Sequence, residues 1–330
     1  MKKFIDTEVR WGIIGVGNVC EVKSAPAMQK IPSSQLIAVM RRDADKAADY
    51  AKRHGVPKWY SDAGELINDP DINAIYIATP PDSHLLYTKM AAAAGKPVYV
   101  EKPMAKTYKE CLEMIKVCED AGVPLFAAYY RRTLPHFLKI KSLIKEGAIG
   151  EVRTLHIEMR KVPEPDIVAD SEKNWRVFPE IAGGGYFYDL ASHQLDFLDF
   201  LFGEITDASG FSANQAGLYP AEDLVAASFK FENGVLGTGN WCFTAASISE
   251  TDLTVISGSK GQISYKTFGE GRVILETDQD GRREFHFELP QHIQYYLIEK
   301  IVGELLGSDK SPSTGVTAAR TNWVMEQIVY

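Results

Sequence analysis

The sequence predicts an α/β protein with two domains: an N-terminal Rossmann-type doubly wound parallel sheet and a C-terminal α+β domain with a mostly antiparallel open sheet. Six short apolar strands alternate with helices up to residue 128. After residue 135, runs of period-two alternation are joined by Asn233-Gly234 and Asp280-Gly281 turns, which indicate hairpins. A length of 330 residues also exceeds the size at which one core keeps growing.

We therefore expect a dinucleotide-binding domain over residues 1–128 and a substrate-binding and oligomerisation domain over residues 129–330. The last two expected helices, 291–306 and 315–329, are predicted to pack back on the first domain. No internal repeat or low-complexity segment interrupts either part.

Composition narrows the kind of partner. A formal net charge of −8 without a long basic run argues against nucleic acid and anionic membranes. No stretch approaches 18 consecutive apolar residues, and Asp6 and Glu8 stand where a secretion signal would be apolar. We expect a cytoplasmic protein that acts on a small molecule. The four cysteines include no CxxC pair, which predicts buried thiols and no metal site.

A glycine-rich turn follows the first expected strand, 9–14. The turn comprises Gly15, Val16, Gly17, Asn18 and Val19, and a helix with Pro26 follows at 21–31. Glycines at this point allow a tight turn and the close approach of a pyrophosphate. The third glycine of the usual pattern is replaced by Cys20. A lone GxG is often only a turn, so cofactor binding and a structural turn both remain open here.

Two arginines, Arg41 and Arg42, end the second expected strand, 35–40, where an acidic residue would bind a ribose 2′-hydroxyl. Guanidinium groups suit a 2′-phosphate, so this position favours NADP(H) over NAD(H), with NAD(H) still possible. The alternative is that both arginines pair with Asp43 and Asp45 at a solvated strand end.

Two further strand ends carry polar residues. The strand 73–78 ends in Thr79-Pro80, and His84 follows in the first turn of a helix, as a cofactor contact or as a structural histidine. The strand 98–100 ends in Glu101-Lys102-Pro103. Because ligands of doubly wound sheets bind beyond the carboxyl ends of the strands, we expect Thr79, Glu101 and Lys102 to face the cofactor.

In the second half, a glycine triplet at 183–185 precedes Asp189 and His193, which are four residues apart and share one helix face. The glycines would let a ligand approach the backbone. By itself, a single histidine on an apolar helix is more often a satisfied core residue. Trp175 and Arg176 precede the triplet and would border a substrate, or Arg176 forms a structural ion pair with Glu172 or Glu180.

Together these motifs resemble the family that contains glucose–fructose oxidoreductase, inositol dehydrogenase and MocA. In chain order they are Gly15-x-Gly17-Asn18, Ala78-Thr79-Pro80-x-x-x-His84, Glu101-Lys102-Pro103, Tyr130-Arg131-Arg132-Thr133-Leu134-Pro135, and Gly183-Gly184-Gly185 with Asp189-x-x-x-His193. Singly the motifs are weak, but their order and their spread over nearly the whole chain are specific. Tyr130 stands where relatives often carry Asn, so substrate identity does not transfer.

The resemblance implies a nicotinamide-dependent oxidoreductase of a sugar, cyclic polyol or related ketone. His193 would be the proton carrier and Lys102 would polarise the reacting oxygen, while Asp189 would orient the substrate. Tyr130 and Arg132 would line the substrate cleft. The outer face of the C-terminal sheet would pair subunits, giving a dimer or tetramer. The Trp175-Arg176 pair resembles the NADPH-dependent anhydrofructose reductase branch, and a dihydrodiol dehydrogenase branch is also similar.

Two other functions remain open at this point. One is a glycosidase of the same fold that oxidises and re-reduces a bound nicotinamide, releasing a sugar without net absorbance change. The other is a non-catalytic sensor that binds a dinucleotide, against which the intact Lys102, Asp189 and His193 argue.

Overall fold

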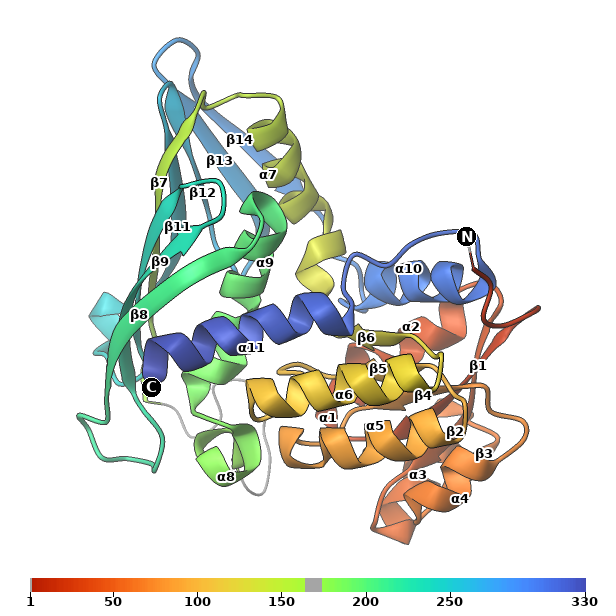
Figure 1. Cartoon of the computed structure of the whole chain (residues 1–330). Helices are drawn as coiled ribbons and strands as arrows, with labels where there is room; N and C mark the ends of the chain where they lie inside the picture. The colour runs from red at the N-terminus through yellow and green to blue at the C-terminus, as the bar shows by residue number, and fades with distance from the viewer. Residues whose placement is uncertain (1, 164–173) are drawn as a thin grey trace. The chain divides into compact units, whose positions relative to one another are not determined.

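The computed structural model describes residues 2–163 and 174–330. The chain divides into two compact units (Figure 1). The first unit contains the residues up to Tyr130 together with Pro290–Ala319, and the second contains Arg131–Leu289 and Arg320–Tyr330. Each unit is described by itself below.

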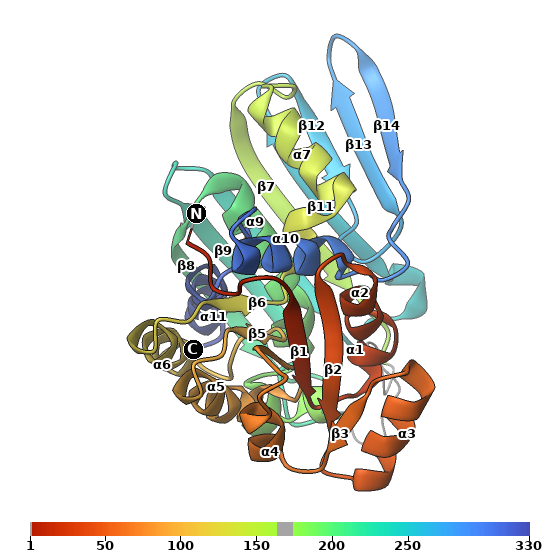
Figure 2. The ribbon, with the colours of Figure 1, turned by 90° about the vertical axis from the view of Figure 1, so that its right-hand side faces the viewer.

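The first unit is built on a six-stranded parallel sheet with the strand order β3-β2-β1-β4-β5-β6, which confirms the predicted Rossmann-type fold. Its strands are β1 (Val9–Ile14), β2 (Ser34–Met40), β3 (Lys58–Tyr60), β4 (Ala74–Ile77), β5 (Val98–Val100) and β6 (Leu125–Ala127). Every residue of β4 and β5 is buried, because helices cover both faces of a parallel sheet. Figure 2 shows α1, α2 and α3 on one side of the strands and α5 and α6 on the other.

Side-chain N-caps by Asp43, Asp62 and Thr107 begin three of the helices of the first unit. The helices of this unit are α1 (Asn18–Val22), α2 (Ala25–Lys30), α3 (Ala44–His54), α4 (Ala63–Asn68), α5 (His84–Ala93), α6 (Tyr108–Asp120) and α10 (Tyr295–Leu306), with a 3₁₀ turn η1 (Pro81–Ser83) before α5. The single helix expected over 21–31 is two helices, because Pro26 lies in the first turn of α2 and starts a new helix there. Helix α10 packs against β1 and α2.

The second unit is built on an eight-stranded sheet with the order β14-β13-β12-β11-β7-β10-β9-β8. Its strands are β7 (Val152–Arg160), β8 (Ile205–Ala213), β9 (Leu224–Phe231), β10 (Leu236–Cys242), β11 (Thr251–Gly258), β12 (Gly261–Tyr265), β13 (Gly271–Thr277) and β14 (Gly281–Phe287). Neighbouring strands are antiparallel except β10 beside β7, so the predicted mixed, mostly antiparallel sheet is confirmed.

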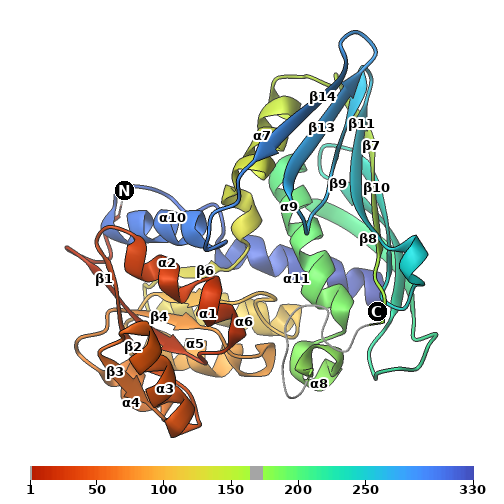
Figure 3. The ribbon, with the colours of Figure 1, turned by 180° about the vertical axis from the view of Figure 1, so that it is seen from behind.

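Helices cover one face of this second sheet (Figure 1, Figure 3). The helices over this face are α7 (Pro135–Lys145) and α9 (Ser192–Phe202). The second unit also contains α8 (Pro179–Ala182), a π-helical segment η4 (Phe187–Ala191) and short 3₁₀ turns η2 (Tyr130–Thr133), η3 (Trp175–Val177) and η5 (Ser247–Ser249). Phe137 of α7 and Phe197 of α9 meet at 4.4 Å between ring centroids, and Tyr265 of β12 packs on both. This aromatic cluster joins the helices to the sheet.

The last helix, α11 (Gly315–Val329), contains residues of both units. Among the residues described, no helix is long and apolar enough to cross a membrane.

Candidate active site

The glycine turn after β1 has the geometry that its sequence predicts. Gly15 has φ +89°, and a Cβ there would lie 2.9 Å from the Thr79 backbone nitrogen, so only glycine fits against the loop that follows β4. At Gly17 a Cβ would meet only the Gly15 oxygen at 4.0 Å, which leaves space for a ligand. Cys20 is fully buried, and Tyr50 donates a hydrogen bond to its carbonyl oxygen, so this side chain belongs to the core.

Most side-chain N–H groups of the two arginines after β2 donate no hydrogen bond to the described residues. Arg41 donates only a long hydrogen bond to the Val16 carbonyl oxygen, at 3.4 Å. Within the described part of the chain, no carboxylate lies within 4.0 Å of either Arg41 or Arg42. Asp43 instead accepts from the Lys46 amide and caps α3. The alternative ion pairs with Asp43 and Asp45 are therefore not formed.

His84 connects the loops after β4 and β5. Its ring is fully buried, with Nε2 2.8 Å from the Thr79 carbonyl oxygen and Nδ1 3.0 Å from the Met104 carbonyl oxygen. Burial lowers the pKa of His84, which favours the neutral ring. This is the structural arrangement that the sequence left open, and it fixes the loop that carries Lys102 against the loop that carries Thr79.

Glu101 is held by a buried network of neutral donors. Its Oε1 accepts from the Tyr76 hydroxyl at 2.5 Å and from the Gln294 amide at 2.6 Å, while Tyr99 donates to the Gln294 oxygen. Its Oε2 accepts from the Lys102 backbone N–H. Burial raises the pKa of both tyrosines well above the usual value, so they remain donors. The carboxylate is thereby fixed beside the half-buried Lys102.

In the second unit, Asp189 lies in the π-helical segment and His193 in the first turn of α9, and both are buried. Arg176 approaches Asp189 with 3.2 Å between Nε and Oδ2. The same guanidinium covers the Trp175 ring at 4.5 Å from its centroid. The structure thus brings together three predicted site residues, Trp175, Arg176 and Asp189.

The structural ion pair that the sequence suggested for Arg176 has a different partner. Glu180 does not lie within 4.0 Å of this guanidinium, and Glu172 lies outside the described residues. The carboxylate that does approach it, Asp189, is far enough along the chain that no local spacing indicates the contact.

The glycine triplet serves packing. Gly183 has φ +88° and ends α8 in the left-handed conformation, while a Cβ at Gly184 would collide with the Tyr188 ring at 2.1 Å. At Gly185 a Cβ would lie 2.8 Å from that of Ala221. Close contacts within the second unit account for glycine at 184 and 185, and the expectation that the triplet lets a ligand approach stays a prediction.

Arg132 also has a different environment from the one expected. Its side chain is buried and donates to both carboxylate oxygens of Asp196 at 2.8 Å. Asp199 lies 3.3 Å away and binds Arg320 as well. This buried ion cluster holds η2, α9 and α11 together, so Arg132 is a structural cation of the second unit. Tyr130, at the start of η2, is also buried.

Phe268 is a neighbour of His193 that sequence reasoning missed. The two rings meet edge to face with 5.7 Å between centroids, and Arg131 stacks on the Phe268 ring at 4.3 Å. The Asp252 carboxylate accepts from the Thr267 and Phe268 amides and fixes this loop. Phe268 follows His193 by 75 positions and carries no motif, so no sequence signal could have found it.

Comparison with family models agrees with this architecture. Residues 9–129 match the model described as an oxidoreductase family with an NAD-binding Rossmann fold, and residues 137–264 match the GFO/IDH/MocA C-terminal domain. The chain is therefore a nicotinamide-binding oxidoreductase. It belongs to the Gfo/Idh/MocA family, which confirms the predicted family and class of enzyme.

Similar proteins cover between 77% and 98% of the chain. A protein named oxidoreductase P35 from Formosa agariphila is 39% identical over 323 residues, covering 98% of both chains. The 1,5-anhydro-D-fructose reductase of Ensifer adhaerens is 28% identical and covers 77% of this chain and 74% of its own. The solved structure of levoglucosan dehydrogenase with NADH and levoglucosan has a TM-score of 0.86 at 23% identity, covering 97% of this chain and 96% of that one. The last likeness shows the shared fold.

Proposed function

We propose that this enzyme transfers a hydride between NADP(H) and a sugar, a cyclic polyol or a related ketone. The observation that carries the choice of cofactor is the pair Arg41 and Arg42, whose guanidinium groups have no carboxylate within 4.0 Å in the described chain. Charges that are not neutralised from within the protein suit a 2′-phosphate. The name of the anhydrofructose reductase relative supports the substrate class.

Residues of the first unit would hold the cofactor. The open space at Gly17 suits a pyrophosphate, and the residues that would bind it or lie near it are Gly15, Val16, Gly17, Asn18, Val19, Arg41, Arg42, Thr79, Pro80, Glu101 and Lys102. His84 acts on these loops from behind, through the Thr79 and Met104 carbonyl oxygens. When bound, the nicotinamide supplies or accepts the hydride.

The remaining chemistry falls to three side chains. His193 takes the proton from the reacting hydroxyl in oxidation and returns it in reduction. Lys102 donates a hydrogen bond to the reacting oxygen and stabilises its developing negative charge. Asp189, positioned by Arg176, accepts from a neighbouring hydroxyl and orients the substrate. Trp175 and Tyr130 would border the substrate, whereas Arg132 is left out because its donors bind Asp196 and Asp199.

We assign cofactor binding to the first unit and substrate binding and self-association to the second. We expect copies of the chain to pair through the face of the second sheet that the helices leave uncovered, where Leu236 is 57% exposed. A dimer or tetramer in the cytoplasm is the expected state, and light scattering after size exclusion measures it.

The test follows NADPH oxidation at its absorbance maximum with a panel of cyclic ketones and sugar-derived ketones. His193→Asn and Lys102→Ala should each lower turnover by about 10²-fold or more on any accepted substrate. Cofactor affinity should change little in His193→Asn, because this residue carries only the proton. The matched controls are His286→Gln and Lys116→Ala, whose side chains are well exposed.

Near-normal turnover in Lys102→Ala would remove the polarising role, and near-normal turnover in His193→Asn would place the proton carrier elsewhere. Release of a free sugar with no net change in nicotinamide absorbance would replace the proposed reaction with the glycosidase alternative.

A further inference from the structure

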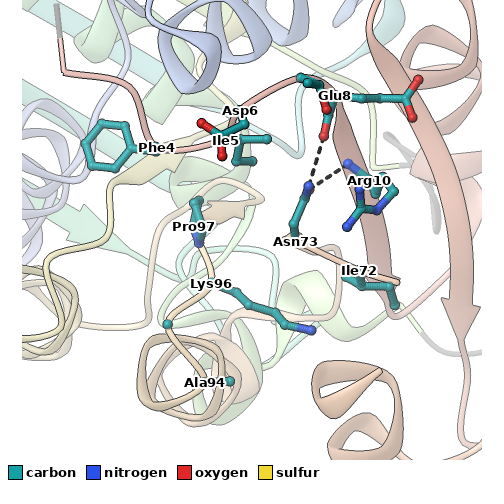
Figure 4. Close-up of a pocket in the computed structure, with 12 residues that line it drawn as sticks. Phe4, Ile5, Asp6, Glu8, Arg10, Ile72, Asn73, Ala94, Lys96 and Pro97 are labelled. Atoms are coloured by element: carbon teal, nitrogen blue, oxygen red, sulfur yellow. Dashed lines mark hydrogen bonds between the residues drawn. The ribbon is translucent and has the colours of Figure 1, made fainter. Parts of the chain in front are cut away.

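A polar pocket lies at the opposite edge of the first unit's sheet from the glycine turn. It has a volume of about 390 Å³, within the usual range for small-molecule sites. Its walls come from the segments that precede β1, β4 and β5, including Glu8, Asn73 and Lys96 (Figure 4). The amino ends of parallel strands face away from the cofactor edge, and the six residues of β1 span roughly 20 Å between the two edges.

Two cations line this pocket. Arg10 uses Nε to donate to the Asp71 carbonyl oxygen at 2.6 Å, and Lys96 donates to the Asp69 carbonyl oxygen at 2.8 Å. No carboxylate of the described residues lies within 4.0 Å of either side chain. A guanidinium has five N–H donors and an ammonium has three. Arg10 and Lys96 each use one donor in these contacts, so both have further N–H groups that can bind a ligand.

The two positive charges also repel each other. Burial lowers the pKa of Lys96, the charge of Asp69 raises it, and the charge of Arg10 lowers it. Figure 4 shows both side chains on the side of the pocket where Ile72 and Asn73 lie. A negative ligand between them would relieve this repulsion.

The carboxylates of the same region are already engaged. Asp6 faces Lys3 at 3.7 Å, Glu8 accepts from the Gln35 amide at 2.9 Å, and Asp69 binds Lys58 and Tyr60. In Figure 4 the Glu8 carboxylate points away from Asn73 and Lys96. Asp6 and Glu8 also line the pocket, so its positive charge is confined to the side that carries Arg10 and Lys96.

We propose that this pocket binds a phosphate group, with Arg10 donating two parallel hydrogen bonds and Lys96 acting as a point charge. This pairing of a planar fork with an ammonium is suited to a tetrahedral dianion. The ligand is inorganic phosphate or the phosphate of a small metabolite, because both present the same three oxygens. The site is separate from the proposed cofactor site and does not depend on the proposed reaction.

The first experiment is calorimetric titration of the intact protein with inorganic phosphate at low ionic strength and saturating NADPH. Arg10→Gln and Lys96→Gln should each raise the phosphate Kd by about tenfold or more, since each removes a charged donor. Lys116→Gln removes one positive charge from an exposed pair with Asp120 and should leave the Kd unchanged. Parallel titration with glucose 6-phosphate separates the sources: tighter binding than phosphate indicates a metabolite, and weaker binding indicates the free ion.

Arg42→Gln shows whether phosphate is binding at the cofactor edge instead. Loss of binding in this variant, with Arg10→Gln and Lys96→Gln unaffected, would overturn the proposal. So would the absence of phosphate binding, which would leave Arg10 and Lys96 as caps of the turn after α4.

A second measurement needs no variant and so does not depend on how well the variants fold. Crystals of the unaltered protein soaked in selenate should show an anomalous peak within hydrogen-bond distance of the Arg10 and Lys96 side chains. A map with selenate bound elsewhere and none at these two residues would contradict the site.

Discussion

The arginines at the end of β2 and those beside α9 belong to the same residue type but have opposite surroundings. Arg41 and Arg42 of the first unit lie on a strand end without a carboxylate within 4.0 Å among the described residues. Arg132 of the second unit is buried and bound to Asp196 and Asp199. The charged partner therefore decides the role of an arginine. An arginine bound to buried carboxylates is structural, whereas one without a nearby carboxylate can bind a ligand.

The largest expected effect is the loss of stability when Arg132, the arginine paired with buried carboxylates, is replaced. Arg132→Leu should lower the free energy of unfolding of the second unit by about 3–5 kcal/mol, because it leaves two buried carboxylates with one fewer cation. Urea unfolding followed by far-UV circular dichroism measures the change. Arg153→Leu, which breaks an exposed pair with Glu151, is the control and should cost at most about 1 kcal/mol. A similar small loss in Arg132→Leu would break the comparison.

Arg41, which has no carboxylate within 4.0 Å in the part of the chain that the structure describes, should show the opposite pattern. Arg41→Gln should raise the NADPH Kd by about tenfold or more, since a charged donor to the 2′-phosphate is lost. The NADH Kd should stay nearly constant, and stability should change by at most about 0.5 kcal/mol. The control is Arg53→Gln, an arginine already paired with Glu21 and Asp49. An unchanged NADPH preference in Arg41→Gln would refute the phosphate contact.

His136 sharpens the comparison, because it is a buried basic group with no carboxylate within 4.0 Å among the residues described. Burial, with Arg131 nearby, lowers the pKa of His136 from 6.5 to about 4. The neutral ring therefore contributes stability that is complete above pH 6.5 and is lost as pH falls toward 4. The slope from this residue is up to about 1.4 kcal/mol per pH unit.

Urea unfolding at pH 7, 6 and 5 measures this slope. His136→Phe keeps a ring beside Phe137 and should reduce the acid sensitivity, whereas His286→Gln, an exposed residue of β14, should leave it as it is. Equal slopes in the original protein and in His136→Phe would show that this histidine does not titrate differently on folding.

The first unit was the more predictable from sequence, because its polar positions follow directly from strand ends. In a parallel sheet, residues that end successive strands meet at one edge, so Gly15, Arg41, Thr79 and Lys102 could be assigned to that edge without knowing any contact. The strands of the second sheet were also predictable, since alternation and Asn-Gly or Asp-Gly turns mark hairpins.

The second unit's side-chain partners were not predictable. Arg132 binds Asp196, 64 positions later, and Phe268 meets His193 from a loop with no motif. Such contacts depend on how α9 packs, and a π-helical segment before it changes the rotation of Asp189 relative to an ordinary helix. The packing role of Gly184 and Gly185 was not predictable, because their neighbours Tyr188 and Ala221 could not be placed from sequence.

The most direct test of the central claim is a fluorescence titration of the purified protein with NADPH and with NADH. Because no carboxylate of the described residues lies within 4.0 Å of Arg41 or Arg42, we expect tighter binding of NADPH, by about tenfold or more. Equal affinity, or a preference for NADH, would contradict the claim that these two guanidinium groups bind a 2′-phosphate.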